Sequence, residues 1–240
     1  MKFAPLAILV LCAFVACTKD SKNDDTAKDS NETKASAAPR NPALTRPDLA
    51  KDKAPKVFKV RVKTTKGPFV IEVHRDWAPH GADRFYNLVK IGFLDGNPFF
   101  RVVKTPQPFM AQFGISGDPK VTAAWANATF PDDPVRKSNR RGYITFARNS
   151  LPNSRSTQLF INFSDNTMLD PPQQKGFAPF GKVVEGMDVV DSLYSGYGEM
   201  KAMGNPGGVD TGRLQRDGID YIKKTFPLMD RIIEARIIEE

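Results

Sequence analysis

Cysteine and histidine are scarce in this chain of 240 residues. It has two cysteines, Cys12 and Cys17, and two histidines, His74 and His80. Both cysteines lie within the first twenty residues, so the rest of the chain can form neither a disulfide framework nor a thiolate metal site. No cysteine accompanies the histidines, which we interpret as ordinary surface or hairpin positions. We therefore expect no metal site, no cofactor and no Ser-His catalytic system.

Long apolar runs are also missing, apart from one at the amino terminus. Residues 3–15 are apolar and follow Lys2, but the run is too short to span a bilayer as a helix. It ends in Ala16-Cys17 before polar residues, a pattern that resembles the bacterial lipoprotein processing signal. We interpret residues 1–17 as a signal peptide with a lipobox-like end, Cys17 as the lipidation site, and the protein as lipid-anchored in a bacterial cell envelope, at the outer membrane or the periplasmic face. Ordinary cleavage near Ala16, giving a soluble periplasmic or secreted protein, is the alternative.

Large apolar residues are almost absent from residues 18–55, which are rich in Lys, Asp, Ser, Asn, Thr, Ala and Pro. Such a segment buries too little surface to offset the entropy that it would lose on ordering. We predict that residues 18–55 are a disordered tether and that residues 56–240 form the folded domain.

The chain carries more basic than acidic residues, with 35 Lys and Arg against 27 Asp and Glu and a net charge of +8. A basic surface of this kind can attract nucleic acid. Here, however, Lys and Arg are scattered, and the longest basic cluster, residues 136–141, is interrupted by Ser138 and Asn139. We interpret the charge as a solvated basic surface and expect no nucleic-acid partner.

Alternating polarity at the start of the domain predicts a β-hairpin. Residues 57–65 and 69–74 alternate between apolar and polar, and the Lys-Gly-Pro sequence at 66–68 is typical of a tight turn. After the hairpin we expect a helix from about 79 to 92 or 96, two strands within 99–114 and a long irregular connection at 116–140. Strands at 143–148, 158–163 and 180–184 and a helix at 187–193 follow. The chain then has a Gly-rich irregular stretch at 195–212, a helix at 217–225 and a closing strand at 228–238 with Ile233, Ala235 and Ile237 on one face. About eight mostly antiparallel strands favour a closed barrel, which leaves no exposed edge.

The stretch 99–114 places Arg101 between two strongly apolar β-type runs. A guanidinium is always charged and offers several N–H donors but no acceptor. In such a strand it is either neutralised in a structural ion pair or a donor to a bound ligand. Phe109, Met110 and Gln112 follow behind a short Pro-containing break. We favour the second interpretation, because the sequence offers no thiol, metal cluster or histidine pair as a rival catalytic group.

Six short motifs occur along residues 57–195. They are Thr64-Thr65-Lys66-Gly67, Ala78-Pro79, Phe100-Arg101-Val102-Val103, Phe109-Met110-Ala111-Gln112, Gln158-Leu159-Phe160-Ile161-Asn162 and Phe180-Gly181-Lys182-Val183-Val184-Glu185-Gly186-Met187. In this order and at this spacing they resemble the cyclophilin-type peptidyl-prolyl cis–trans isomerases. The resemblance implies a mainly β fold, a closed eight-stranded antiparallel β-barrel capped by two helices, with the active groove on its outer surface. It leaves residues 195–226 as a Gly-rich and helical insertion without an assigned role.

The resemblance also implies a site of ten residues. Arg101 matches the family's catalytic arginine, and Gln112 matches the glutamine that orients this arginine and the substrate backbone. The residues that match the proline pocket and its groove are Phe109, Met110, Phe160, Leu169, Gln158 and Asn149. Met168 and Phe177 complete the expected substrate-binding residues but depart from the family, since many members have an aromatic residue at the first position and some have a histidine at the second. The link 104–108 is also longer than usual.

The activity implied by the resemblance is rotation about the peptide bond before proline in proline-containing polypeptides. Rotation breaks no bond, so it requires no nucleophile, acid–base pair or metal, which suits a chain poor in histidine and cysteine. With the expected lipid anchor in the membrane, the substrates would be exported proteins, and we expect a monomer. The alternative is a cyclophilin-like peptide-binding or chaperone module with little catalysis, motivated by Met168, Phe177 and the longer link.

Overall fold

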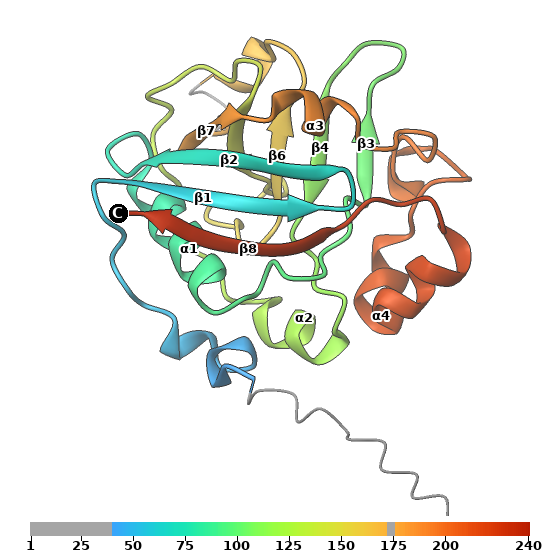
Figure 1. Cartoon of the computed structure of the whole chain (residues 1–240), viewed down its shortest axis with the longest axis horizontal. Coiled ribbons are helices and arrows are strands. Elements are labelled where there is room, and N and C mark those ends of the chain that lie inside the picture. Colours follow the sequence, from blue (N-terminus) through green and yellow to red (C-terminus); the bar gives the residue numbers. More distant parts are fainter. Residues whose placement is uncertain (1–39, 172–175) are drawn as a thin grey trace, which may run out of the picture. The chain divides into compact units, whose positions relative to one another are not determined.

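The computed structural model (Figure 1) describes residues 40–171 and 176–240. The predicted signal peptide 1–17, with the predicted lipidation site Cys17, and residues 18–39 of the predicted tether lie outside the described residues. Within the described ranges, no helix combines the length and the apolar character needed to cross a membrane.

Eight strands form a single curled sheet, and all hydrogen-bonded neighbours in it are antiparallel. In chain order the strands are β1 Val57–Thr64, β2 Gly67–His74, β3 Arg101–Val103, β4 Met110–Phe113, β5 Tyr143–Phe146, β6 Leu159–Asn162, β7 Gly181–Glu185 and β8 Ile232–Glu239. Their order across the sheet is β3-β4-β6-β5-β7-β2-β1-β8. The prediction of a mainly β fold with eight antiparallel strands is confirmed.

The predicted closed barrel is wrong, because the two edge strands β3 and β8 do not pair. The segments just before these strands meet at an isolated bridge between Pro98 and Arg231, flanked by backbone hydrogen bonds from Phe99 to Asp230 and from Ile232 to Asn97. β3 itself is only three residues long and is not paired with β8, so the hydrogen-bond ladder does not continue along the two edges. The strands instead form an open half-barrel, and Arg101 lies at the start of an edge strand.

Strand β8 pairs with β1 through a register shift that alternation in the sequence does not reveal. Thr64 pairs with Ile232, whereas the residue before Thr64 pairs with Glu234, so Ile233 is the extra residue of a β-bulge. The bulge leaves Ile233 44% exposed, while Ile232 is buried. The apolar face predicted for this strand is therefore wrong at Ile233, although Ala235 is buried as expected.

The resemblance implies two helices, but the described part of the chain contains four. They are α1 Pro79–Lys90, α2 Pro119–Trp125, α3 Met187–Asp191 and α4 Thr211–Thr225. α1, α3 and α4 confirm predicted helices, and Gly92 ends the first of them with a φ of +75°. α2 lies in the stretch expected to be an irregular connection. A signal for it is present, because Asp118 accepts the N–H of Lys120 as the N-cap and Pro119 opens the first turn.

Residues 40–55, assigned by their composition to the disordered tether, are ordered against the domain. They form two 3₁₀ turns, η1 Pro42–Leu44 and η2 Pro47–Leu49. The Trp125 indole of α2 donates to a carbonyl of η1 at 3.0 Å, and Asp83 of α1 accepts a backbone N–H shortly before β1 at 2.9 Å. Side chains of the domain thus satisfy backbone groups of this segment and order it despite its few apolar residues.

The insertion 195–226 forms a second, smaller core beside β3 and β4. Its buried residues are Phe100, Ile115, Val209, Leu214, Tyr221, Ile222, Phe226 and Met229. α4 lies beside α2 (Figure 1) and bends at Gly218, where a φ of +65° and a Cβ position only 2.4 Å from the Gly117 carbonyl oxygen require glycine. Because Phe100 directly precedes Arg101, the insertion packs against the strand that carries the arginine.

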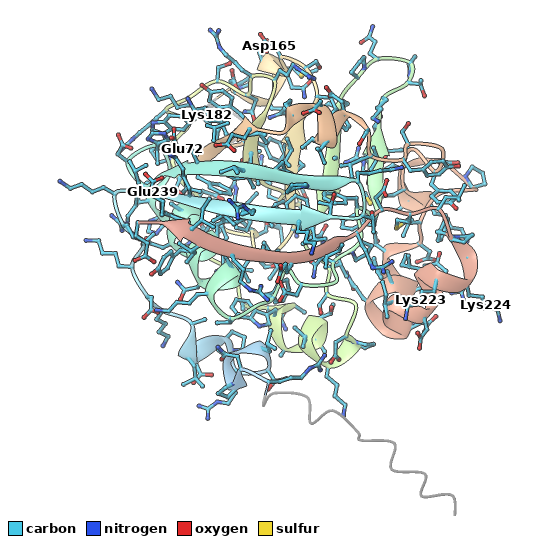
Figure 2. All side chains as sticks on the ribbon, viewed as in Figure 1. Glu72, Asp165, Lys182, Lys223, Lys224 and Glu239 are labelled. Carbon is cyan, nitrogen blue, oxygen red and sulfur yellow. The ribbon has the colours of Figure 1, made fainter. Side chains whose placement is uncertain are left out.

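Charged side chains of both signs are interspersed over the surface that Figure 2 shows. Lys223 and Lys224 lie on the last turn of α4, where their charge complements the helix dipole. On the sheet, Glu72 of β2 lies 2.8 Å from Nε2 of His74 and 3.9 Å from Nζ of Lys182 on the neighbouring β7. Acidic and basic side chains thus lie side by side on this part of the sheet.

Candidate active site

Two cavities of about 580 Å³ each open on the surface of the described residues. The first lies on the outer face of β1, β2 and β8, and none of the predicted site residues lines it. The second opens beside Arg101 and is lined by nine of the ten predicted site residues. Because the second cavity combines a cation with apolar walls, we treat it as the candidate active site and call it the arginine cavity.

The arginine cavity brings together residues that lie far apart in the sequence. The predicted residues that line it are Arg101, Phe109, Met110, Gln112, Asn149, Gln158, Phe160, Leu169 and Phe177. Met168 does not line the cavity and is 67% exposed, because it lies in the 3₁₀ turn η3, Thr167–Leu169, which turns only Leu169 to the cavity wall. Met168 is therefore the one predicted site residue that the arginine cavity does not bring together with the others.

Three polar side chains form a connected chain along the cavity. Arg101 is paired with Gln112 across β3 and β4, and its Nη1 donates to Oε1 of Gln112 at 3.1 Å. The amide nitrogen of Gln112 donates in turn to Oε1 of Gln158 at 3.0 Å. The guanidinium carbon of Arg101 lies 5.7 Å from the centre of the Phe109 ring. These contacts fix the orientation of the guanidinium at the cavity wall.

The floor of the arginine cavity is apolar. Met110 and Phe160, from the paired strands β4 and β6, are 2% and 3% exposed. The Phe160 ring meets Phe177 edge to face, with ring centres 5.6 Å apart. Leu169, half-buried, adds a fourth apolar side chain. Aromatic and thioether groups pack well against apolar surfaces, so this floor suits a flat apolar ring.

Arg155 supports the Phe177 side of the cavity from within the protein. Its side chain is 3% exposed, forms an ion pair with Asp132 and donates from Nη2 to the Gly176 carbonyl at 2.8 Å. Its guanidinium carbon lies 6.0 Å from the centre of the Phe177 ring. Burial lowers the pKa of Arg155 to about 10, which still leaves it charged at neutral pH. Arg155 thus holds the backbone before Phe177 in place.

Asn149 lies on an exposed loop at the rim of the cavity. Its side-chain oxygen accepts the N–H of Leu151 at 2.8 Å, and its own N–H donates to Oγ of Ser154 at 3.2 Å. These bonds shape the loop itself. The side chain of Asn149 therefore contributes to the cavity as part of its rim.

The insertion contributes residues that the sequence motifs do not predict. Met200 and Met203 line the arginine cavity. Glu199, next to them, accepts a hydrogen bond at Oε2 from Nη2 of Arg101 at 2.7 Å, and its Oε1 lies 2.5 Å from Nε. Since 98 positions separate the two residues, no local spacing connects them. The one sequence signal that could have drawn attention to Glu199 is a carboxylate followed by two methionines in a Gly-rich segment.

This chain is similar to known peptidyl-prolyl cis-trans isomerases. A family model for cyclophilin type peptidyl-prolyl cis-trans isomerases (CLD) matches residues 59–207. The peptidyl-prolyl cis-trans isomerase of Acinetobacter baylyi is 37% identical over 144 residues, which cover 56% of this chain and 70% of that protein. Peptidyl-prolyl cis-trans isomerase B of Escherichia coli is 30% identical over 191 residues, which cover 75% of this chain and 99% of that protein. All residues that line the arginine cavity fall within the range of the family model.

Solved structures share the fold. A crystal structure of a Cryptosporidium parvum cyclophilin type peptidyl-prolyl cis-trans isomerase has a TM-score of 0.55 and 20% sequence identity, and covers 77% of this chain and 99% of that chain. A second structure of that protein, in the presence of the dipeptide Ala-Pro, has a TM-score of 0.54 and 21% identity. At these identities the likeness concerns the fold alone.

Proposed function

This chain belongs to the cyclophilin-type peptidyl-prolyl cis–trans isomerase family, and we propose that Arg101 is its catalytic residue. Enzymes of this family rotate the peptide bond before proline. The observation that carries the proposal is the position of Arg101, whose side chain lines a cavity with an apolar floor and is 11% exposed. A charged donor in a partly dry site beside an apolar floor suits a substrate that combines a polar backbone with an apolar ring.

Rotation is slow because amide resonance gives the C–N bond partial double-bond character, with a barrier of about 18–20 kcal/mol. At the twisted geometry this resonance is lost, and the lone pair of the prolyl nitrogen becomes a hydrogen-bond acceptor. An N–H donated by Arg101 to that nitrogen stabilises the twisted state more than either planar isomer. A barrier lowered by about 7 kcal/mol would accelerate rotation about 10⁵-fold.

Apolar side chains of the floor, together with Phe109, supply the other half of the site. We propose that Phe109, Met110, Phe160 and Leu169 hold the pyrrolidine ring, and that Gln112 and Gln158 bind the backbone of the proline-containing polypeptide. The support is geometric, because the floor and the two amides line one cavity together with Arg101. The ring is then held while the chain on its N-terminal side rotates.

Replacement of Arg101 tests this assignment. Arg101→Ala is expected to keep the circular dichroism spectrum and to lose turnover of an Xaa-Pro peptide by about 100-fold or more, the usual effect of removing a transition-state donor. Arg61→Ala, which removes an exposed arginine of β1 outside the arginine cavity, is the matched control and should turn over like the wild type. Equal turnover in the two variants would refute the role of Arg101. Tight peptide binding by the wild type with negligible turnover would instead favour a peptide-binding module.

We propose further that the protein is lipid-anchored in a bacterial cell envelope and acts there on exported proteins. The support is the sequence of residues 1–17, with an apolar run that ends at Cys17. In bacteria that express the full chain and are fed labelled palmitate, the label should enter the wild type and be lost in Cys17→Ser. Cys12→Ser should keep the label. A processed wild-type protein without label would refute the anchor and favour the soluble alternative.

A further inference from the structure

The insertion 195–226 reaches Arg101 through Glu199. Oε2 of Glu199 accepts a hydrogen bond from Nη2 at 2.7 Å, while Oε1 lies 2.5 Å from Nε, which has no aligned hydrogen-bond acceptor among the described residues. Gln112 binds Nη1, so both terminal nitrogens of the guanidinium are held. We propose that Glu199 is a positioning residue that keeps Arg101 in its catalytic orientation. This inference rests on the catalytic role proposed for Arg101.

Glu199 reaches the guanidinium without occupying the cavity. Arg101, Met200 and Met203 line the arginine cavity, but Glu199 does not. Each terminal nitrogen of Arg101 carries two N–H groups and has one hydrogen-bond partner within the described part of the chain. One N–H on each nitrogen is therefore left for a substrate. Glu199 therefore holds Arg101 without blocking access of a substrate to the cavity.

The loop that carries Glu199 is fixed by contacts of its own. Oε1 of Glu199 also accepts the N–H of Met200 at 2.8 Å, and the Glu199 carbonyl accepts from Nδ2 of Asn205 at 3.0 Å. The N–H of Lys201 donates at 3.0 Å to the carbonyl of Val209, which belongs to the second core. The carboxylate is thus held in place before any substrate binds.

Holding Arg101 in advance affects the reaction more than it affects peptide binding. A free arginine side chain samples many rotamers, and fixing one of them in the transition state costs entropy. Glu199 and Gln112 fix that rotamer in the free enzyme, so less entropy is lost when the guanidinium meets the twisted bond. Loss of this support should therefore lower kcat and leave KM nearly unchanged.

Glu199→Gln removes the negative charge at nearly constant size. We expect kcat for an Xaa-Pro peptide to fall about tenfold, equivalent to about 1.4 kcal/mol, with KM changed by less than about twofold. Asp217→Asn is the matched control, because it removes the same charge from the same insertion in an exposed pair with Arg213 at 3.4 Å. The control should keep the wild-type kcat. An unchanged or raised kcat in Glu199→Gln would overturn the proposal.

A double-mutant cycle separates positioning from a general effect on the loop. In the Arg101→Ala background, Glu199→Gln is expected to cause no further loss, because Glu199 acts through Arg101. The same fractional loss in both backgrounds would overturn the proposal. Wild-type turnover in Arg101→Ala alone would identify the catalytic assignment as the failed step, and the inference would fall with it.

Relaxation of the Arg101 Nε–H by ¹⁵N NMR gives a readout that does not depend on turnover. We expect larger side-chain motion in Glu199→Gln than in Asp217→Asn or the wild type, since one of two anchors of the guanidinium is weakened. Equal motion in the three proteins would overturn the proposal, whatever the kinetics show.

Discussion

Replacement of Gly208 by alanine tests how firmly the insertion presents Glu199 to Arg101. A Cβ at Gly208 would lie 1.9 Å from the carbonyl oxygen of Glu199 and 3.0 Å from its carbonyl carbon. Ordinary van der Waals contact begins at 3.4 Å, so the two backbone segments must separate by about 1.5 Å. A shift of this size in the Glu199 backbone would carry the 2.7 Å bond between Glu199 and Arg101 beyond hydrogen-bonding range.

We expect Gly208→Ala to lower the free energy of unfolding by about 1–3 kcal/mol, the usual cost of overpacking. For a folded domain of this size, the melting temperature should fall by about 2–12 °C. Turnover of an Xaa-Pro peptide should fall about as far as in Glu199→Gln, because the same contact is lost. Thermal unfolding followed by circular dichroism and a peptide isomerisation assay measure the two effects.

Gly207→Ala is the matched control, since it makes the same chemical change at the neighbouring position. A Cβ there would meet only Oδ1 of Asn205, at 3.6 Å, and the backbone φ is not positive. This variant should stay within about 0.5 kcal/mol of the wild type and keep its turnover. If Gly208→Ala behaves like Gly207→Ala in both assays, the packing argument is refuted. If stability falls while turnover holds, the packing is right but the shift does not reach the contact between Glu199 and Arg101.

Two further predictions concern the cavity floor and an ion pair. Phe160→Ala should lower the free energy of unfolding by about 3–5 kcal/mol and raise KM, because the ring is 3% exposed. Urea denaturation and peptide kinetics measure these two effects. Wild-type stability in this variant would contradict the packing of Phe160. Arg40→Ala should raise the pKa of Asp118, because the hydrogen bond from Arg40 is the largest cause that holds this pKa below 3.8; an NMR titration that gives the same pKa in both proteins would contradict this. Since the stabilisation is present above about pH 3.8 and lost as pH falls through the lowered pKa, the variant should lose stability at neutral pH, and its difference from the wild type should shrink in acid. The loss should be small, because Arg40 is 73% exposed.

The strands could be predicted from the sequence because alternation is a local signal. Phe58, Val60 and Val62 of β1 are buried where the pattern places them. Barrel closure could not be predicted in this way, because it depends on whether two edges far apart in sequence meet. The short β3 does not pair with β8, and the two edges meet only through the segments that precede these strands. The bulge at Ile233 is equally invisible in β8 alone, since it is a property of its register on β1.

The same difference between local signals and long-range contacts applies to the predicted site. Phe109, Met110 and Gln112 lie in one short motif, and the pairing of β4 with β6 brings Phe160 beside them. Family motifs therefore located most of the arginine cavity. Met168 lies outside it because a 3₁₀ turn does not keep consecutive side chains on one face. The contact of Glu199 with Arg101 could not be predicted, because it depends on the packing of the second core.

Arg101 needs a partner of opposite charge because it is largely withdrawn from water. Its side chain is 11% exposed. A guanidinium that leaves water loses much of its solvation free energy, and without a counter-ion nothing compensates for that loss. Gln112 orients the guanidinium but carries no charge, so it cannot compensate for that loss. Exclusion of water strengthens the hydrogen bond from Arg101 to a prolyl nitrogen. The negative charge of Glu199 offsets the free-energy cost of removing the guanidinium from water. A buried guanidinium therefore depends on the nearby carboxylate of Glu199. Removal of this carboxylate should increase the hydration of the guanidinium as well as lower turnover.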